Sequence, residues 1–359
     1  MAEAPPTVTI LIAARPGQAE VKAVGASRGL RYPAEKLEII IARGRQPSAQ
    51  RNAALKAAQG EWVYFLDDDS VPDPENLRRA AAYFNRPEVK MVGGPNLCPP
   101  DAPPLERVFA LVLASWLAFG PSRARYTPVG MPRETSEKEL ILCNLLARRQ
   151  PMLELGGFNE ALYPNEENAL MDELQKRGGK LIYDPELFVY RRPRSNLKSF
   201  ARMLMTYGRG RAEQFRLHPT PGSALNFVPP LFCVYLVVLA AGLILVPRIG
   251  WFFTAPLACY VFALLVQALA LIRSPSLGRG DESQVRLNQR PNQHLGPGPR
   301  YLGSPKGEGF AVRVWKSLAA VPLIVLSHIL YGLGFWIGLF TTLRPSGKPA
   351  PGEVGLEKI

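Results

Sequence analysis

The chain contains few of the residues that form disulfides and metal clusters. It has only four cysteines and three histidines among 359 residues. The cysteines form no Cys-x-x-Cys pair and have no metal-ligand spacing with the histidines; the residues are Cys98, Cys143, Cys233, Cys259, His218, His294 and His328. This pattern argues against a zinc module and a disulfide framework, and we expect reduced, structural cysteines.

The sequence also lacks a secretory signal. The first residues, MAEAPPTVTILIAAR, show no basic region followed by a long apolar core. We therefore expect the N-terminal domain to stay in the cytoplasm.

Nucleic-acid-binding signatures are missing too, although the formal net charge is +13. Such a charge suits nucleic acid, anionic lipid or phosphorylated substrates. Because no recognition helix, zinc finger or aromatic RNA-binding pattern accompanies it, we expect membrane and phosphorylated partners and no nucleic acid.

The first half of the chain has the rhythm of an α/β domain. Short apolar runs at Val8–Ala13, Leu37–Ala42 and Trp62–Leu66 predict strands, and Ser48–Gln59 predicts a helix. Such runs alternating with helices indicate a largely parallel, buried sheet. Further strands are expected at Met91–Gly94, Leu140–Ala147 and Lys180–Val189, and a helix start with Asp73 as N-cap.

The second half is dominated by apolar runs. Spans are predicted at 225–246, 251–272 and 317–343. The basic loop 273–316 is placed in the cytoplasm by the positive-inside rule, which leaves the tail after Arg344 on the far side.

The segment just before these spans has a different character. Asn196–Leu217 has apolar residues at helical spacing beside basic ones, typical of an interfacial helix. Val108–Phe119 is too short to span, and fits a core helix and a membrane-dipping surface about equally. We expect three parts: a catalytic domain over 1–192, an interfacial region over 193–222 and a membrane domain over 223–359.

Three carboxylates follow a buried apolar strand. The run Trp62–Leu66 leads directly into Asp67, Asp68 and Asp69. Ligands of open α/β sheets bind beyond the carboxyl ends of strands. Asp67 and Asp69 could therefore hold a nucleotide and a Mg²⁺ or Mn²⁺ ion that neutralises a leaving diphosphate. The alternative is a solvated acidic turn that caps the next helix.

The order of several motifs resembles family-2 inverting glycosyltransferases with the GT-A fold, in particular the membrane-anchored branch that includes succinoglycan-type enzymes. The resemblance covers roughly residues 7–215. It rests on Gln50–Ala54 and Gly60–Asp69, Gly156–Glu160, Asn165–Asn168 with Leu170, Leu174 and Gly178-Gly179, Phe188–Tyr190 and Tyr207–Ala212.

The resemblance implies roles for individual residues. Asp67 and Asp69 match the Asp-x-Asp element, with Asp69 preferred for the metal. Glu167 stands at the place of the catalytic base, with Glu166 beside it. Asn165 would be the N-cap, so that both glutamates lie in the first helical turn, where the helix dipole favours ionised carboxylates. Donor contacts are expected from Ala14, Arg15, Arg43, Arg51, Asn52, Asp67, Asp68, Arg209 and Arg211. For both glutamates, stabilisation of the helix start is the alternative, and for Arg209 and Arg211 it is contact with lipid headgroups.

The sequence departs from the family pattern in three places. The family's Asp after the second strand is replaced by Ile41-Ala42-Arg43, so Arg43 could contact the base or phosphate. The base is Glu rather than Asp. The Gln-x-x-Arg-Trp motif of processive synthases is absent.

These patterns predict an integral membrane protein of the bacterial inner-membrane type, with a cytoplasmic catalytic domain. It would transfer a sugar with inversion from a nucleotide-diphosphate sugar to a lipid or lipid-linked acceptor. The alternatives are a polyprenyl-phosphate glycosyltransferase and a catalytically silent membrane scaffold.

Overall fold

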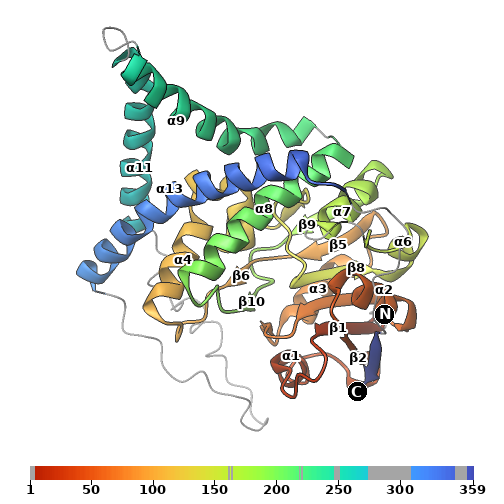
Figure 1. The fold of residues 1–359 in the computed structure, drawn as a ribbon. Coiled ribbons are helices and arrows are strands. Elements are labelled where there is room, and N and C mark those ends of the chain that lie inside the picture. Colours follow the sequence, from red (N-terminus) through yellow and green to blue (C-terminus); the bar gives the residue numbers. More distant parts are fainter. Residues whose placement is uncertain are drawn as a thin grey trace.

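The computed structural model describes residues 5–160, 162, 165–217, 219, 221–245, 251–273, 309–343 and 354–359. Most of the predicted basic loop, 274–308, lies outside these residues, as do 344–353. Two parts lie side by side in Figure 1: an α/β unit built on a sheet, and a group of long helices that covers one side of it.

The sheet has eight strands in the order β11-β2-β1-β3-β8-β5-β9-β7. Strands β1 (Val8–Ala14), β2 (Leu37–Arg43) and β3 (Trp62–Asp67) are parallel, as are β5 (Val89–Gly93) and β9 (Lys180–Tyr183). Strands β8 (Asn144–Arg148), β7 (Arg133–Thr135) and β11 (Gly355–Lys358) are antiparallel to their neighbours. The predicted α/β class is confirmed. The sheet is mixed, with parallel pairing in β2-β1-β3 and in β5-β9.

A smaller sheet lies beyond the large one. Its strands, in the order β4-β10-β6, are β4 (Val71–Pro72), β10 (Val189–Tyr190) and β6 (Asn96–Leu97). The predicted strand at Lys180–Val189 is therefore two strands, β9 in the large sheet and β10 in the small one. This division places the residues after Tyr190 beside the end of β3.

The helices of the α/β unit are short. They are α1 (Lys22–Ser27), α2 (Pro47–Ala57), α3 (Asn76–Phe84), α6 (Arg149–Glu154) and α7 (Glu166–Lys176). The prediction of Asp73 as an N-cap is wrong, because α3 begins at Asn76. The Asp73 carboxylate accepts the Glu75 amide in a turn, and the Asp73 amide donates to Phe188 O.

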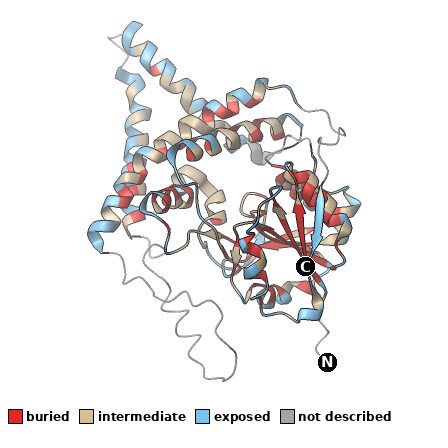
Figure 2. Cartoon of the chain, turned by 60° about the horizontal axis from the view of Figure 1, so that its bottom comes forward, coloured by how far each residue is buried: buried red, intermediate tan, exposed pale blue. Residues whose placement is uncertain are grey.

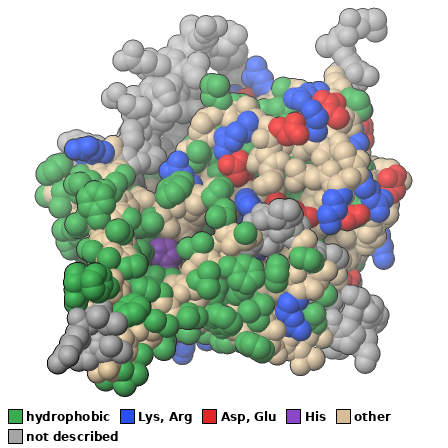
Figure 3. Space-filling model, turned by 90° about the horizontal axis from the view of Figure 1, so that it is seen from above, with side chains coloured by type: hydrophobic (Ala, Val, Ile, Leu, Met, Phe, Trp, Pro, Cys, Tyr) green, Lys and Arg blue, Asp and Glu red, His purple; other side chains and the backbone are tan. Residues whose placement is uncertain are grey.

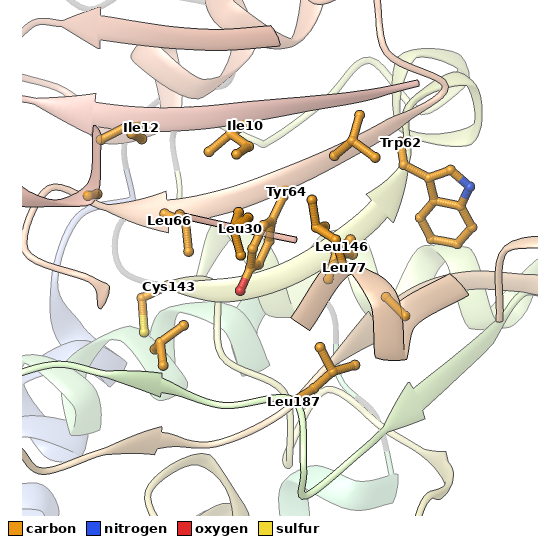
Figure 4. Close-up of a cluster of buried hydrophobic side chains, with 14 of the residues drawn as sticks. Ile10, Ile12, Leu30, Trp62, Tyr64, Leu66, Leu77, Cys143, Leu146 and Leu187 are labelled. Atoms are coloured by element: carbon orange, nitrogen blue, oxygen red, sulfur yellow. The ribbon is translucent and has the colours of Figure 1, made fainter. Parts of the chain in front are cut away.

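The sheet is buried on both faces, as the red strands of Figure 2 show. On one face Ile10, Ile12, Tyr64 and Leu66 project from β1 and β3 into a cluster with Leu187 (Figure 4). The buried Tyr64 hydroxyl donates to Asn144 Oδ1 at 2.7 Å. Apolar side chains on both faces explain why these strands are continuous apolar runs in the sequence.

The long helices form the second part. They are α8 (Leu197–Leu217), α9 (Val228–Leu245), α11 (Ala255–Arg273) and α13 (Phe310–Phe340), with α4 (Pro104–Ala114) and the short α5 (Trp116–Phe119) beneath them. Within the described part of the chain, three helical stretches are long and apolar enough to cross a membrane: Ala224–Leu245, Trp251–Arg273 and Phe310–Phe340. The third begins seven residues earlier than predicted, inside the expected loop.

Helices α4 and α8 attach this group to the α/β unit. Phe109 of α4 stacks on Phe200 of α8 with ring centroids 4.2 Å apart, and both are buried with Ala320 and Ile324 of α13. The Val108–Phe119 segment therefore contains a core helix, although Trp116 at its end is exposed.

The C-terminal strand contradicts the expected topology. Strand β11 pairs with β2 at the edge of the catalytic sheet (Figure 1), with Leu356 opposite Ala42. A tail on the far side of a membrane could not reach this edge, so the placement of the tail after Arg344 is wrong. Hydropathy could not reveal it, because the pairing joins residues about 300 positions apart.

Gly94 provides a test of the packing between the two sheets. A Cβ there would lie 1.9 Å from Leu187 O and 2.3 Å from Asp184 O, so Gly94→Ala must move backbone. We expect a loss of about 1–3 kcal/mol in unfolding free energy, visible as a lower melting temperature. Gly25→Ala is the control, because it meets nothing within 4 Å in α1 and should be neutral or slightly stabilising. Equal melting temperatures for the two variants would contradict this packing.

Candidate active site

The carboxyl ends of β2, β1 and β3 lie side by side. Register pairs Ala14 with Arg43 and Ala13 with Asp67. Gln50 of α2 fastens the first two ends, donating to Ala14 O at 2.8 Å and Ala42 O at 2.6 Å. Parallel strands with helices behind them commonly bind ligands at this edge.

Asp67 and Asp69 converge on one cationic group. The Arg191 guanidinium lies 3.1 Å from Asp67 Oδ2 and 2.6 Å from Asp69 Oδ1. Burial alone would raise the pKa of Asp67, but Arg191 and Arg51 together hold it below its usual range. The two carboxylates therefore lie close enough to share the Arg191 guanidinium.

Arg51 extends this cluster to helix α7. Its guanidinium lies 3.3 Å from Asp67 Oδ1 and 2.9 Å from Glu166 Oε1. The five side chains Glu166, Arg51, Asp67, Arg191 and Asp69 thus form one continuous ion network. It joins β3, α2, the start of α7 and the segment after β10.

The start of α7 has the predicted arrangement. Asn165 is the N-cap, with a left-handed φ of 100°, and its Oδ1 accepts from Asn168 Nδ2 at 2.9 Å rather than from the helix backbone. Glu166 and Glu167 follow in the first turn. Their environments differ: Glu166 is buried against Arg51, while Glu167 is half-buried.

Burial raises the pKa of Glu166, and the nearby charge of Glu167 raises it further against the opposing effect of Arg51. Two adjacent carboxylates that repel one another favour one shared proton. The buried Glu166 therefore favours its protonated form, and the half-buried Glu167 is the more accessible of the two carboxyl groups.

A second polar chain runs through Asp68. Its carboxylate accepts from Gln18 Nε2 at 2.7 Å, and Gln18 O accepts from Arg43 at 2.8 Å. Arg43 in turn pairs with Glu357 of β11 at 3.1 Å. Asp68 therefore faces away from the Asp67–Asp69 pair and fixes the loop after β1, which contains the exposed Arg15.

Asn52 is a structural residue in this chain. It donates to Phe158 O and Glu160 Oε1, both at 2.9 Å, and accepts the Phe158 amide at 2.8 Å. Gly157, with φ of 79°, packs so close that a Cβ would lie 2.4 Å from Asn52 Oδ1. The two motifs Gln50–Ala54 and Gly156–Glu160 are thus locked together, and the Asn52 amide is occupied by that contact.

Arg209 and Arg211 make their side-chain contacts along α8. Arg209 pairs with Glu213 at 3.4 Å, and Arg211 donates to Gln214 Oε1 at 3.1 Å. Gln214 also contacts Asp172 of α7 at 3.3 Å, so this end of α8 lies beside the acceptor-side helix.

A cavity of about 340 Å³ opens from Asp69 toward the long helices. Its polar side contains Arg191, Arg192 and Arg194, and its apolar side contains Leu113 of α4 and Met203 of α8. Tyr126 and Tyr207 also line it. The cavity thus links the carboxylate pair to the helices that would face a membrane.

Arg191, Gln18 and Glu357 were not predicted as site residues. The basic run Arg191-Arg192-Pro193-Arg194 after a short strand was the available signal for Arg191. Gln18 lies in an ordinary loop, and Glu357 reaches the site only through β11, so neither has a local signature.

Residues 1–206 match the model of a family described as "Glycosyltransferase like family 2". The chain belongs to this family. The match and the observed α/β fold with its apolar helices confirm the expected GT-A catalytic domain followed by candidate membrane helices.

The chain is also similar to curated pre-mycofactocin glycosyltransferases of two Mycobacterium tuberculosis strains. It is 26% identical to each over 174 residues, which are 48% of this chain and 36% of the relative. The chain thus matches about a third of the length of these relatives.

Two solved structures are similar to this chain in fold. The mannosyltransferase PcManGT from Pyrobaculum calidifontis, in complex with GDP-Man and Mn²⁺, is 18% identical with a TM-score of 0.44, covering 76% of this chain and 82% of that one. TarS from S. aureus is 12% identical with a TM-score of 0.40, covering 64% and 43%.

The ion network can be tested through Arg51. Arg51→Met leaves Glu166 buried without its partner, which should cost about 3–5 kcal/mol in unfolding free energy. The loss should grow with pH. Burial and Glu167 raise the pKa of Glu166 to about 8 even with Arg51 beside it, and removing Arg51 raises it further, so ionising Glu166 at high pH destabilises the variant more than the parent chain. Thermal unfolding at pH 6 and pH 9 would measure it.

The control is Arg51→Met combined with Glu166→Gln. This double variant removes the uncompensated charge and should recover part of the stability, with less dependence on pH. Equal stability of the single and double variants at both pH values would show that the pair is not coupled as described.

Proposed function

We propose that this chain is an inverting glycosyltransferase that uses a nucleotide-diphosphate sugar and a membrane-associated acceptor. One observation carries the proposal: the ion network brings the strand-end carboxylates and the first turn of α7 into one site. An inverting transfer uses two groups on opposite sides of the sugar. One stabilises the negative charge of the leaving diphosphate, and the other accepts the proton of the attacking hydroxyl.

The donor end lies at β1, β2 and β3. The family relationship supports a nucleotide sugar, and the strand edge supplies Arg43, Arg15 and the Ala14 backbone. Asp67 and Asp69 supply carboxylate oxygens that would hold a divalent cation in place of the Arg191 guanidinium, which contacts an oxygen of each, and the described residues add no third carboxylate, histidine or cysteine to form a metal-ligand cluster with them. Mg²⁺ and Mn²⁺ accept such oxygen ligands, and the ion would neutralise charge on the departing diphosphate.

Glu167 is proposed as the base. It follows Glu166 in the first turn of α7 and is the less buried of the two glutamates. Glu166 is a positioning residue that ties α7 to Asp67 through Arg51. The acceptor hydroxyl would lose its proton to Glu167 as its oxygen attacks the anomeric carbon.

The acceptor is proposed to enter through the cavity between α4 and α8. Its apolar wall suits a lipid, and the nearby apolar helices support membrane attachment. Arg192 and Arg194 at the same cavity also suit a phosphate. They favour polyprenyl phosphate as the second candidate acceptor; its oxygen is already ionised and needs no base. We propose that the catalytic domain faces the cytoplasm.

The donor end is tested by Asp69→Asn. Removing one of two carboxylates should weaken Mn²⁺-dependent donor binding by about tenfold or more, since even outer-shell changes cost this much in metal sites. Calorimetric titration with UDP-glucose, GDP-mannose and dTDP-glucose, with and without Mn²⁺, would first identify the donor and then measure the change. Asp68→Asn is the matched control, because Asp68 binds Gln18 instead of Arg191. Unchanged metal-dependent affinity in Asp69→Asn would remove Asp69 from the site.

The base is tested by Glu167→Gln beside Glu166→Gln. Glutamine is nearly isosteric and loses the basicity, so Glu167→Gln should lower kcat by about a hundred- to ten-thousand-fold with little change in donor affinity. Glu166→Gln should retain more activity. If Glu166→Gln alone is inactive, the register is wrong by one residue. If both variants remain active, polyprenyl phosphate becomes the preferred acceptor.

A further inference from the structure

The C-terminal strand limits how this chain can cross a membrane. Strand β11 is held at the sheet edge by backbone pairing and by two side-chain contacts: Glu357 to Arg43 at 3.1 Å and Lys358 to Glu38 at 2.7 Å. The Ile359 amide donates to Ile39 O at 3.0 Å. The chain therefore returns to the catalytic domain, and the number of crossings between α8 and β11 must be even.

Helices α4 and α5 do not change this number. They form a bent pair that could count as a fourth span. However, they lie between β6 and β7, both of which belong to the sheets of the catalytic domain. The chain enters and leaves this pair on the same side.

Three candidate spans remain, and one of them cannot cross. Helices α9 and α11 follow one another in the chain across the short segment 246–254, which suits a hairpin of two crossings. In that arrangement α13 is the helix that does not cross, and its packing on α8 distinguishes it from the other two.

Helix α13 packs on α8 with backbone against backbone. A Cβ at Gly208 of α8 would lie 2.0 Å from Tyr331 O, and one at Gly334 of α13 would lie 2.1 Å from Met205 O. The last turn of α13 is fixed as well: Arg216 of α8 donates to Gly338 O at 3.1 Å and Thr341 O at 2.5 Å.

Helix α8 itself stays with the catalytic domain at both ends. Phe200 near its start stacks on Phe109, and Gln214 near its end contacts Asp172 of α7. It also contains the exposed Lys198 and Arg202, which are costly inside a bilayer. A helix packed along α8 is therefore held at the catalytic face.

The face of α13 opposite α8 is apolar and exposed. It contains Trp315 and Leu318, 58% and 59% exposed, then Leu333, Ile337 and Phe340, the last 81% exposed. These residues fall on one stripe at helical spacing. Figure 3 shows a broad hydrophobic surface on this side of the molecule. Helices α9 and α11 also have exposed apolar side chains, among them Leu231 and Phe262.

We propose that α13 lies along the membrane surface on the catalytic side, with its apolar stripe in contact with the lipid bilayer, and that only the α9–α11 hairpin crosses. We assign lipid to this stripe, rather than a protein partner, because the neighbouring α9–α11 hairpin also exposes apolar side chains. The length of α13 agrees with this placement. Its 31 residues extend about 46 Å at 1.5 Å per residue, which exceeds the roughly 30 Å thickness of the hydrocarbon core. The inference rests on the proposed membrane attachment.

Thiol labelling of the membrane-inserted full chain would test it. We would place single added cysteines by Arg28→Cys in the catalytic domain, Gly309→Cys before α13 and Thr342→Cys after it. An impermeant maleimide would be applied to right-side-out and inside-out vesicles. Intact-protein mass spectrometry would count the maleimide labels on each variant. The parent chain, which has the same four native cysteines as every variant, gives the background count.

All three positions should label from the same face. Labelling of position 309 or of position 342 from the face opposite to position 28, or from neither face, would overturn the proposal. An alkaline wash that removes the chain from membranes would instead refute the membrane attachment itself. None of these readouts depends on transferase activity, so the two failures can be distinguished.

A disulfide tests the strand pairing in the same membranes. Ala42 and Leu356 are opposite one another, and facing residues of antiparallel strands have Cα atoms about 4.5–5.5 Å apart, within disulfide range. Oxidation should join Ala42→Cys to Leu356→Cys within one chain. The pair Arg28→Cys and Leu356→Cys is the control that should not join. Absence of the first cross-link would remove the constraint on which the proposal depends.

Discussion

The contacts of Arg51 and Arg191 with three carboxylates are the interactions on which this site depends. Asp67 and Asp69 lie about 100 positions before Glu166 in the sequence, and without cations between them the three carboxylates would repel one another. The two guanidiniums allow them to gather at one strand edge. The arrangement fixes helix α7 relative to β3, and with it the position of Glu167 relative to the donor.

The architecture around the site follows from two long-range contacts. Asn52 locks the Gly156–Glu160 turn to α2, so that the segment leading to α7 is anchored beside the donor end. Strand β11 closes the other end of the sheet and brings Glu357 to Arg43. The catalytic domain is therefore assembled from both ends of the chain, with the apolar helices inserted before its last strand.

The sequence was informative where the signal is local. The carboxylates Asp67 and Asp69 could be predicted because a buried strand ends there, and Glu166 and Glu167 because Asn165 starts a helix. Strands β1, β2 and β3 agree with their apolar runs within one residue.

The sequence could not predict roles that depend on distant partners. Arg191 contacts carboxylates that lie more than 120 positions earlier in the chain. Asn52 was predicted to bind the donor, and in the structure its side-chain amide is hydrogen-bonded to Phe158. The tail was placed across the membrane because hydropathy counts apolar runs without knowing where a four-residue strand will pair. The sheet is mixed because β8, β7 and β11 join it from later segments, which the apolar runs alone do not order.

The central claim is that the strand-end carboxylates and Glu167 act on opposite sides of one anomeric carbon. The anomeric configuration of the first-formed product tests it most directly, measured by proton NMR coupling after a single turnover with an α-linked nucleotide sugar. A single in-line displacement predicts a β-linked product. An α-linked product would contradict the account.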